Sequence, residues 1–471
     1  MRRRAPLIAV ALFVIAQIAA SRFVSLESVQ AGLMQAFSAF GIPYNTGIVL
    51  MGTGLLGLAS GVIGSFAVLR RRSLVGDAVA HCALPGLCIA FLLVGHRNFQ
   101  ALLFGALVSG VIGAAVISWL RVNTRIKTDT AIALVLSVFF GLGIALSGII
   151  QNDPSGQQAG LDSFLLGKTA GLVSLDLILI LLVCLNTLVF VGLFYKEFLV
   201  LSFDPGFSQV QGWPVTLLDI LMMSLLVVVT VIGLPAVGVV LMAAMLITPG
   251  VAARFWTEDL GKMLWLAAIF GTVTGVAGAV FSSMMAGAPT GPVIVLTGAA
   301  ICMASMMIAP KRGVLAKAYR TIKLQKKIAT QNLLRTMFEL TEDTLPVVSA
   351  ITVEDLTTRR AWSPGEAKKL LTQADRQGLA SRAGDEGWKL TSKGLTEAAS
   401  VVRTHRLWEI FLVEQASIAA SHVDRDADMV EHILPPEMVT ELENRLKDEG
   451  RLPALALASV HPLGQDTEAA V

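Results

Sequence analysis

Two adjacent stretches of sequence decide the fold. Residues 47–69 read GIVLMGTGLLGLASGVIGSFAVL, and residues 70–86 read RRRSLVGDAVAHCALPG. The first stretch has no charged residue and is long enough to cross a bilayer core of roughly 30 Å as a helix. The second begins with three arginines and is then apolar apart from Asp77 and His81. Basic residues between two apolar stretches indicate membrane-spanning helices joined by a cytoplasmic loop.

Similar apolar stretches recur through the first two thirds of the chain. Of its 471 residues, 54% are hydrophobic and only 15% are charged, which is untypical of a soluble globular protein. We therefore predict an all-α polytopic membrane bundle of about nine or ten transmembrane helices. These spans are expected near residues 6–23, 47–69, 78–95, 100–120, 129–150, 173–195, 215–233, 235–253, 262–285 and 288–309.

The basic residues of this part follow the even-numbered spans, which predicts that those loops and both termini are cytoplasmic. We expect a multi-pass protein of the bacterial inner (plasma) membrane. The arginines at positions 2–4 favour an N-terminal membrane anchor over a cleaved signal peptide, because many further apolar stretches follow. A re-entrant hairpin at Gly233–Gly238 is an alternative that would change the number of spans.

Asp77 and His81 stand four residues apart, so on a helix they share one face and reach a single cation. Ionisable residues at membrane depth are costly and usually line a transport pathway. A carboxylate with an imidazole suits manganese, iron or zinc. Two alternatives stay open: the pair locks two helices together, or Asp77 lies at the water interface beside the arginines.

The segment from Leu69 to Gly86 resembles the signature of the ABC permeases that transport zinc, manganese and iron. Residues 128–143, 161–167 and 237–249 resemble further stretches of that family, in the same order. The resemblance covers roughly residues 45–310. It implies that Asp77 and His81 are metal ligands on the translocation path.

The same resemblance implies the partners of the chain. It implies a homodimeric or paired permease that takes metal from a solute-binding protein and is driven by a separate ATPase, so the chain itself is expected not to be an enzyme. Residues 195–212 resemble the coupling helix that docks on that ATPase, with candidate contacts at Glu197, Phe203, Asp204 and Gly206. An interfacial helix with no partner is the alternative for this loop.

The rest of the chain has the charge content of a soluble protein. Residues 1–310 hold 15 Lys/Arg and 11 Asp/Glu, whereas residues 311–471 hold 22 and 23. We expect a transmembrane permease domain over 1–310, a basic juxtamembrane linker over 311–327, a winged helix-turn-helix domain over 328–403, and a helical metal-binding and dimerisation domain over 404–471. The seven basic residues of the linker are typical of a cytoplasmic segment beside a membrane.

A helix is predicted from Ser363, because Ser-Pro-Gly-Glu supplies a serine cap, a proline at the first helical position and a glutamate at the third. Residues 381–390 predict a two-stranded wing that turns between Gly384 and Gly387. These elements together are typical of a winged helix-turn-helix, although many such domains bind only protein. The candidate DNA-binding residues are Ser363, Lys368, Lys369, Gln373 and Arg376.

Two later segments collect metal-ligating side chains. His405 and Glu409 are four residues apart, and Asp428, Glu431 and His432 stand at i, i+3 and i+4 of another predicted helix. Each set therefore converges on one helix face. Solvated helix faces also collect acidic residues, so each residue taken alone is weak evidence.

The order of these segments resembles the iron- and manganese-dependent repressors of the diphtheria toxin repressor type. The resemblance implies that the five residues ligate an activating metal, with His422 as a further candidate. Asn332 departs from the family, which usually has methionine or an acidic ligand there. Oxygen-rich ligation favours Mn²⁺ or Fe²⁺, with Zn²⁺ as the alternative divalent ion.

The leading interpretation is the permease subunit of an ATP-driven metal importer whose cytoplasmic tail senses the metal and could bind DNA. A membrane-tethered metal-dependent transcription regulator is one alternative, although so many spans exceed what an anchor needs. A proton-coupled secondary metal transporter is another, against which the coupling-helix resemblance speaks.

Overall fold

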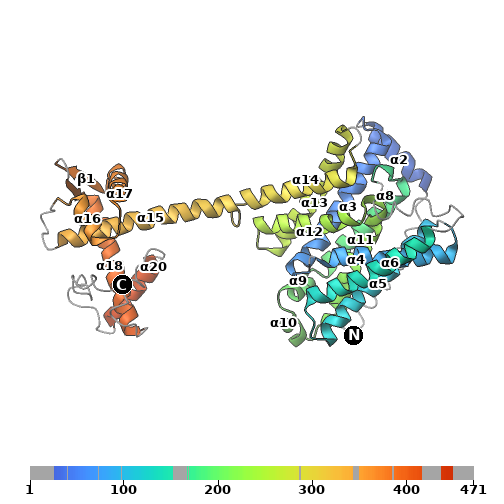
Figure 1. The fold of residues 1–471 in the computed structure, drawn as a ribbon, viewed down its shortest axis with the longest axis horizontal. Helices are drawn as coiled ribbons and strands as arrows, with labels where there is room; N and C mark the ends of the chain where they lie inside the picture. The colour runs from blue at the N-terminus through green and yellow to red at the C-terminus, as the bar shows by residue number, and fades with distance from the viewer. Residues whose placement is uncertain are drawn as a thin grey trace. The chain divides into compact units, whose positions relative to one another are not determined.

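The computed structural model describes residues 26–39, 41–72, 74–96, 98–151, 167, 169–285, 288–342, 350–384, 387–415 and 436–448. The chain forms two compact units, Met1–Lys317 and Ala318–Val471, which are described separately below. Both are mostly helical (Figure 1).

The first unit is a helical bundle, as predicted. Within the described residues, eight helices are long and apolar enough to cross a membrane. The first expected span, residues 6–23, lies outside the described residues. The eight helices are α3 (Tyr44–Leu69), α4 (Leu74–Val94), α5 (Phe99–Asn123), α6 (Thr128–Gln151), α8 (Ser174–Leu193), α11 (Val215–Val237), α13 (Leu260–Met284) and α14 (Thr290–Ile308).

A shorter apolar helix, α12 (Val239–Trp256), follows α11 directly. Gly238 separates the two, and its φ of 83° is a left-handed conformation that favours glycine. The segment expected as a possible hairpin is therefore the end of α11 and a one-residue break. Prolines lie inside three helices of this unit: Pro85 in α4, Pro235 in α11 and Pro249 in α12.

Glycines allow α3 and α13 to touch backbone to backbone. A Cβ atom on Gly57 would collide with the carbonyl oxygen of Gly271, and one on Gly271 would collide with that of Gly57. One turn further, a Cβ on Gly275 would collide with the carbonyl oxygen of Thr53. Close helix approach through small residues is the usual way in which membrane helices pack, because lipid provides little hydrophobic drive between them.

Shorter helices complete this unit. The helix α2 (Leu26–Ala39), which the sequence did not lead us to expect, precedes α3, and Gln30 Nε2 donates a 2.6 Å hydrogen bond to Ser174 Oγ at the start of α8. A single 3₁₀ turn, η1 (Thr169–Gly171), comes before α8. Between α8 and α11 lie α9 (Tyr195–Phe203) and α10 (Pro205–Val210).

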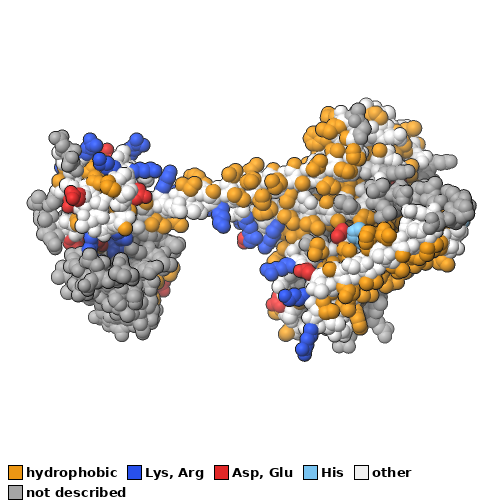
Figure 2. All heavy atoms as spheres, viewed as in Figure 1, with side chains coloured by type: hydrophobic (Ala, Val, Ile, Leu, Met, Phe, Trp, Pro, Cys, Tyr) orange, Lys and Arg blue, Asp and Glu red, His pale blue; other side chains and the backbone are white. Residues whose placement is uncertain are grey.

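The surface of the membrane unit is largely apolar. Figure 2 shows hydrophobic side chains over most of its visible face, with basic side chains gathered on the side where α9 and α10 lie in Figure 1. Large hydrophobic residues such as Leu93, Trp119 and Leu296 are exposed there. This distribution suits a bundle surrounded by lipid.

The second unit begins at Ala318, within α15 (Val314–Thr341). Its other elements are α16 (Val353–Arg359), α17 (Pro364–Arg376), β1 (Ala380–Ala383), β2 (Gly387–Leu390), α18 (Ser392–Gln415) and α20 (Pro436–Asp448). The expected two-stranded wing is present, since β1 and β2 pair antiparallel with Ala380 opposite Leu390. Ile351 bridges to Trp388 on the other side of β2. The core between helices and wing includes Leu333, Met337, Leu371 and Trp388.

Candidate functional site

Asp77 and His81 lie in the first two turns of α4. Asp77 Oδ1 is 3.5 Å from His81 Nε2, and the side chains are 37% and 21% exposed. The His81 ring lies nearly perpendicular to that of Phe140 in α6, with 4.8 Å between the centroids. The structure therefore brings the predicted pair together on one face, held against an aromatic ring but reachable.

The second ring nitrogen of His81 has no partner. Nδ1 is buried, and no described residue forms a hydrogen bond with it. Buried polar atoms are nearly always satisfied, and leaving one unpaired costs about 1–3 kcal/mol. Within the described chain, neither Asp77 nor His81 is seen bonded to another helix. The pair is therefore not a hydrogen-bonded lock between α4 and another described helix.

The predicted coupling segment is a pair of short helices with a buried and an exposed side. Phe198 and Leu201 of α9 are fully buried, and the Phe198 ring packs edge-on against Phe66 of α3 at 5.6 Å. Glu197 lies in the first turn of α9, partly exposed. This contact joins the short helices firmly to the bundle.

Asp204 separates the two short helices and caps the second. Its Oδ1 accepts a 2.9 Å hydrogen bond from the Phe207 backbone N–H, which is a standard helix start. Gly206 follows within that first turn and is exposed. The outer side is apolar, because Phe203, Phe207 and Val210 are 55%, 48% and 86% exposed. Phe207 and Val210 were not among the predicted contact residues.

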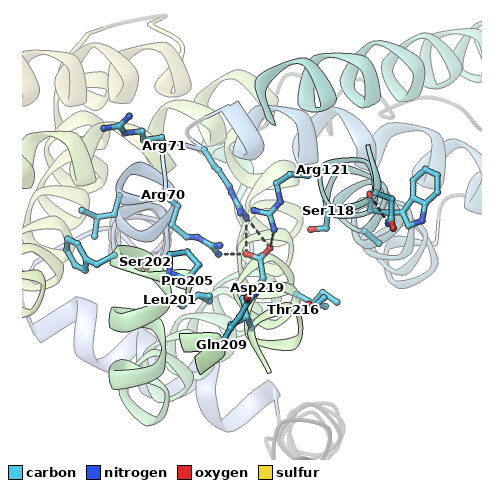
Figure 3. Close-up of a pocket in the computed structure, with 18 residues that line it drawn as sticks. Arg70, Arg71, Ser118, Arg121, Leu201, Ser202, Pro205, Gln209, Thr216 and Asp219 are labelled. Atoms are coloured by element: carbon cyan, nitrogen blue, oxygen red, sulfur yellow. Dashed lines mark hydrogen bonds and ion pairs between the residues drawn. The ribbon is translucent and has the colours of Figure 1, made fainter. Parts of the chain in front are cut away.

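A second polar site near these helices was missed from the sequence. Asp219, in the second turn of α11, is 2% exposed and surrounded by arginines. Arg72 Nη1 lies 2.9 Å from Asp219 Oδ1, Arg121 Nη2 lies 2.8 Å from Oδ2, and Arg70 pairs with Oδ1 as well. Figure 3 shows Arg70 and Arg121 turned toward Asp219, while Arg71 points away. We call Arg70, Arg72, Arg121 and Asp219 the arginine cluster.

The arginine cluster lines a cavity of about 900 Å³. Its walls come from the α3–α4 connection, the end of α5, the α9–α10 pair and the start of α11. Burial lowers the pKa of Arg70 below its ordinary value; Asp219 opposes that effect, and Arg121 adds to it. From the sequence, Arg70, Arg72 and Arg121 predicted only which side of the membrane their loops occupy. The one available signal was Asp219, a lone carboxylate inside an expected span.

In the C-terminal unit, α17 begins as predicted. Ser363 Oγ accepts a hydrogen bond from Glu366 N–H, while Ser363 N–H and Oγ–H donate to Glu366 Oε2 at 3.0 and 2.8 Å. These bonds hold the pKa of Glu366 below its usual value.

The inner face of α17 buries Ala367, Leu371 and Ala374. Lys368, Lys369 and Arg376 are exposed on the helix and Gln373 is half-buried, so a basic face remains open to a partner.

His405 is 3% exposed in α18, and an arginine contacts it. Arg335 Nη1 of α15 lies 3.0 Å from His405 Nδ1, and Arg335 Nε donates to Glu339 at 2.6 Å. Because a guanidinium only donates, Nδ1 is the acceptor and is unprotonated. One turn before Arg335, Asn332 Oδ1 is buried and has no hydrogen-bond partner among the described residues. Both groups have the chemistry of metal donors.

The other predicted ligands cannot be placed. Asp428, Glu431, His432 and His422 lie outside the described residues, and so does the side chain of Glu409, whose backbone belongs to α18. Within the described part of the chain, no three His, Cys, Asp or Glu residues lie close enough to hold a metal. The regulatory metal set therefore stays a prediction.

Comparisons with known proteins match two separate parts of the chain to two family models. Residues 44–309 match the model of the ABC 3 transport family, and residues 391–453 match that of the iron dependent repressor, metal binding and dimerisation domain. The chain is similar to the manganese transport system membrane protein MntC of Bacillus subtilis, with 41% identity over 88% of this chain and 94% of that protein.

Two further similarities cover the membrane part. The zinc transport system membrane protein TroC of Treponema pallidum is 45% identical over 61% of this chain and 95% of its own length. The solved structure of PsaBC from Streptococcus pneumoniae in complex with Fab has 32% identity and a TM-score of 0.51, covering 60% of this chain and 97% of that one.

Proposed function

The chain belongs to the ABC 3 transport family, and we propose that it is the permease subunit of an ATP-driven importer of a divalent transition metal in a bacterial inner membrane. The observation that carries this proposal is the Asp77–His81 pair, in which a carboxylate oxygen and the imidazole Nε2 lie 3.5 Å apart on one face of a membrane helix. Such donors suit Mn²⁺, Fe²⁺ or Zn²⁺ as cargo. The similar proteins are named for manganese and zinc transport, which supports this choice of cargo.

The permease works as a pair under this proposal. One chain supplies two cargo ligands at this point, whereas transition metals in proteins are commonly held by about four. A second copy, or a related permease, would bring a matching pair to the same path. Partial exposure of Asp77 and His81 leaves them open to such a neighbour.

The energy comes from a separate ATPase that docks on α9 and α10. Exposed Phe203, Phe207 and Val210 offer it an apolar contact, and Asp204 fixes the start of α10. Buried Phe198 and Leu201 would carry a displacement of this segment into the bundle. A metal-bearing solute-binding protein would deliver cargo on the opposite side of the membrane. Glu197 and Gly206 complete the proposed contact.

The C-terminal unit responds to the same metal under this proposal. Asn332 Oδ1, which is buried and has no partner among the described residues, fits a bound cation, and His405, Glu409, Asp428, Glu431 and His432 would complete the set. A bound Mn²⁺ or Fe²⁺ would supply charge that draws these helices together. The exposed basic face of α17 is suited to DNA, and contact with DNA requires that the C-terminus lie in the cytoplasm; the N-terminus is proposed to lie on the same side.

The cargo proposal is tested by metal uptake in cells. Asp77→Asn and His81→Ala should each lower uptake of Mn²⁺ or Zn²⁺ by about tenfold or more, because each removes one charged or ligating group from the path. His96→Ala is the matched control, since His96 is an exposed histidine of the same unit. Equal uptake by His81→Ala and His96→Ala, at equal amounts of protein in the membrane, would contradict the proposal.

The regulatory proposal is tested by calorimetry on the full-length protein carrying Asp77→Asn, so that the transport path does not contribute. Saturable Mn²⁺ or Fe²⁺ binding should be lost in Glu431→Ala and His432→Ala and weakened about tenfold in Asn332→Ala. Retained binding in all three variants would place the metal elsewhere. Exposed Gln377 of the same unit offers Gln377→Ala as the control.

A further inference from the structure

The arginine cluster carries more positive charge than the described residues around it balance. Three guanidinium groups share the single carboxylate of Asp219. The side chains of Arg70 and Arg72 are only 6% and 7% exposed, that of Asp219 is 3% exposed, and that of Arg121 is 27% exposed. Charges taken out of water require partners, and one carboxylate neutralises only one of three cations.

The excess charge faces an open space. The cavity beside the arginine cluster has a volume of about 900 Å³, far more than ordered water needs. Arg121 is the most exposed member and lies at the end of α5, so an incoming anion meets it first. Guanidinium groups match the oxygens of a phosphate in geometry as well as charge.

The rim of the cavity is apolar and exposed. Trp119 and Ile220 line it and are 60% and 43% exposed. Tryptophan is enriched where lipid headgroups meet the hydrocarbon region, and basic pockets between helices on the cytoplasmic side suit anionic headgroups. The cavity therefore joins a phosphate-binding end to an edge that can contact acyl chains.

We propose that the arginine cluster binds a phosphate-bearing anion, in which a phosphate group pairs with Arg121 and Arg72 beside Asp219. This site is distinct from the Asp77–His81 pair and is adjacent to the coupling segment α9–α10, which forms part of its wall. The bound phosphate supplies the negative charge that Asp219 alone does not, and it ties the end of α5 to the α3–α4 connection. The same chemistry is offered by an anionic lipid headgroup and by free phosphate.

Binding is measured on the purified full-length protein in a neutral detergent by calorimetry and native mass spectrometry. The probes are dioctanoyl phosphatidylglycerol, inorganic phosphate, and dioctanoylglycerol, which has the same acyl chains without phosphate. Saturable binding of phosphatidylglycerol but not of inorganic phosphate assigns the site to a lipid headgroup. Binding of both at comparable affinity assigns it to free phosphate. Phosphatidylglycerol binding no tighter than that of dioctanoylglycerol, with no binding of inorganic phosphate, would overturn the proposal.

Three variants separate recognition from damage to the fold. Arg121→Gln should weaken binding about tenfold, because one charge-assisted contact is lost. Arg125→Gln is the matched control: it changes an exposed arginine only four residues from Arg121 that does not line the cavity, and it should leave binding unchanged. Asp219→Asn should instead tighten binding several-fold, because it removes the anion that competes for the arginines, and general loss of structure cannot produce that gain.

The ATPase is the competing occupant of this region. If the arginines contact that protein instead, Arg121→Gln will weaken ATPase association and leave phosphate binding unchanged. That outcome would overturn the proposal. Equal binding by Arg121→Gln and Arg125→Gln, or weaker binding by Asp219→Asn, would also overturn it.

Discussion

The membrane unit and the C-terminal unit both bury arginine, but they neutralise it differently. In the C-terminal unit, Arg406 forms two hydrogen bonds of 2.9 and 2.6 Å to Glu342, one cation to one carboxylate. In the membrane unit, three arginines gather around Asp219. A matched buried pair holds a structure together, whereas an unmatched buried charge leaves room for a ligand. The ratio of arginine to carboxylate therefore separates a structural site from a candidate binding site.

The two units also differ in how their helices pack. Helices α3 and α13 meet through glycine, backbone against backbone. The core of the C-terminal unit instead contains large side chains such as Leu371 and Trp388. Helices surrounded by lipid gain little from the hydrophobic effect when they associate. They are stabilised instead by van der Waals contacts, which require the helices to approach closely.

The largest effect is expected at the glycine contact. Gly57→Leu would force a side chain into the carbonyl of Gly271, so we expect a loss of more than about 4 kcal/mol in stability and little folded protein. Gly141→Leu in α6 is the control, because a Cβ there meets nothing within 4 Å. The yield of monodisperse protein and its melting temperature measure the difference. Similar yields and melting temperatures for the two variants would contradict the close packing of α3 and α13 through glycine.

A smaller effect is expected at the matched pair. Glu342→Ala would leave Arg406, whose side chain is 6% exposed, without its carboxylate. We expect the free energy of unfolding of the C-terminal unit to fall by about 3 kcal/mol. Urea denaturation of residues 318–471, followed by tryptophan fluorescence, measures this. Glu441→Ala, at an exposed position of α20, should change it by less than about 0.5 kcal/mol. If Glu342→Ala lowered the free energy of unfolding as little as Glu441→Ala, Arg406 would need no carboxylate partner.

The smallest effect is expected at the cap of α17. Ser363→Ala should destabilise the C-terminal unit by about 1 kcal/mol near pH 7, because it removes a helix cap. Thr372→Ala, on the same helix, is its control.

The effect of Ser363→Ala should depend on pH. Hydrogen bonds from Ser363 lower the pKa of Glu366 from 4.5, so this contribution is present above pH 4.5 and disappears as the pH falls through the lowered value. The destabilisation measured in urea should therefore shrink in acid. A difference independent of pH between 7 and 3 would show that Glu366 has no part in the cap.

The sequence predicted those features that are local. Apolar length located eight of the expected spans to within a few residues, and Ser363 with Glu366 marked the start of α17. Spacing of four residues was enough to place Asp77 and His81 on one face.

Features that depend on distant residues were not predicted. Arg72 and Arg121 indicated only which side of the membrane they occupy, because nothing in their local sequence points to Asp219 about 100 residues or more later. The α2 helix was missed, since its apolar content is too low for a span. Asp428, Glu431 and His432 remain predictions from spacing and resemblance.

Pro85 gives α4 a mechanical property that follows from its place in the chain. Proline has no N–H, so α4 lacks the hydrogen bond that would otherwise link residue 85 to the carbonyl group of His81. A helix bends most easily where such a bond is missing. The turns that carry Asp77 and His81 can therefore tilt as one rigid piece against the half of α4 that follows Pro85. The pair would keep its spacing while the direction in which it faces changes, as alternating access to the two sides of a membrane requires.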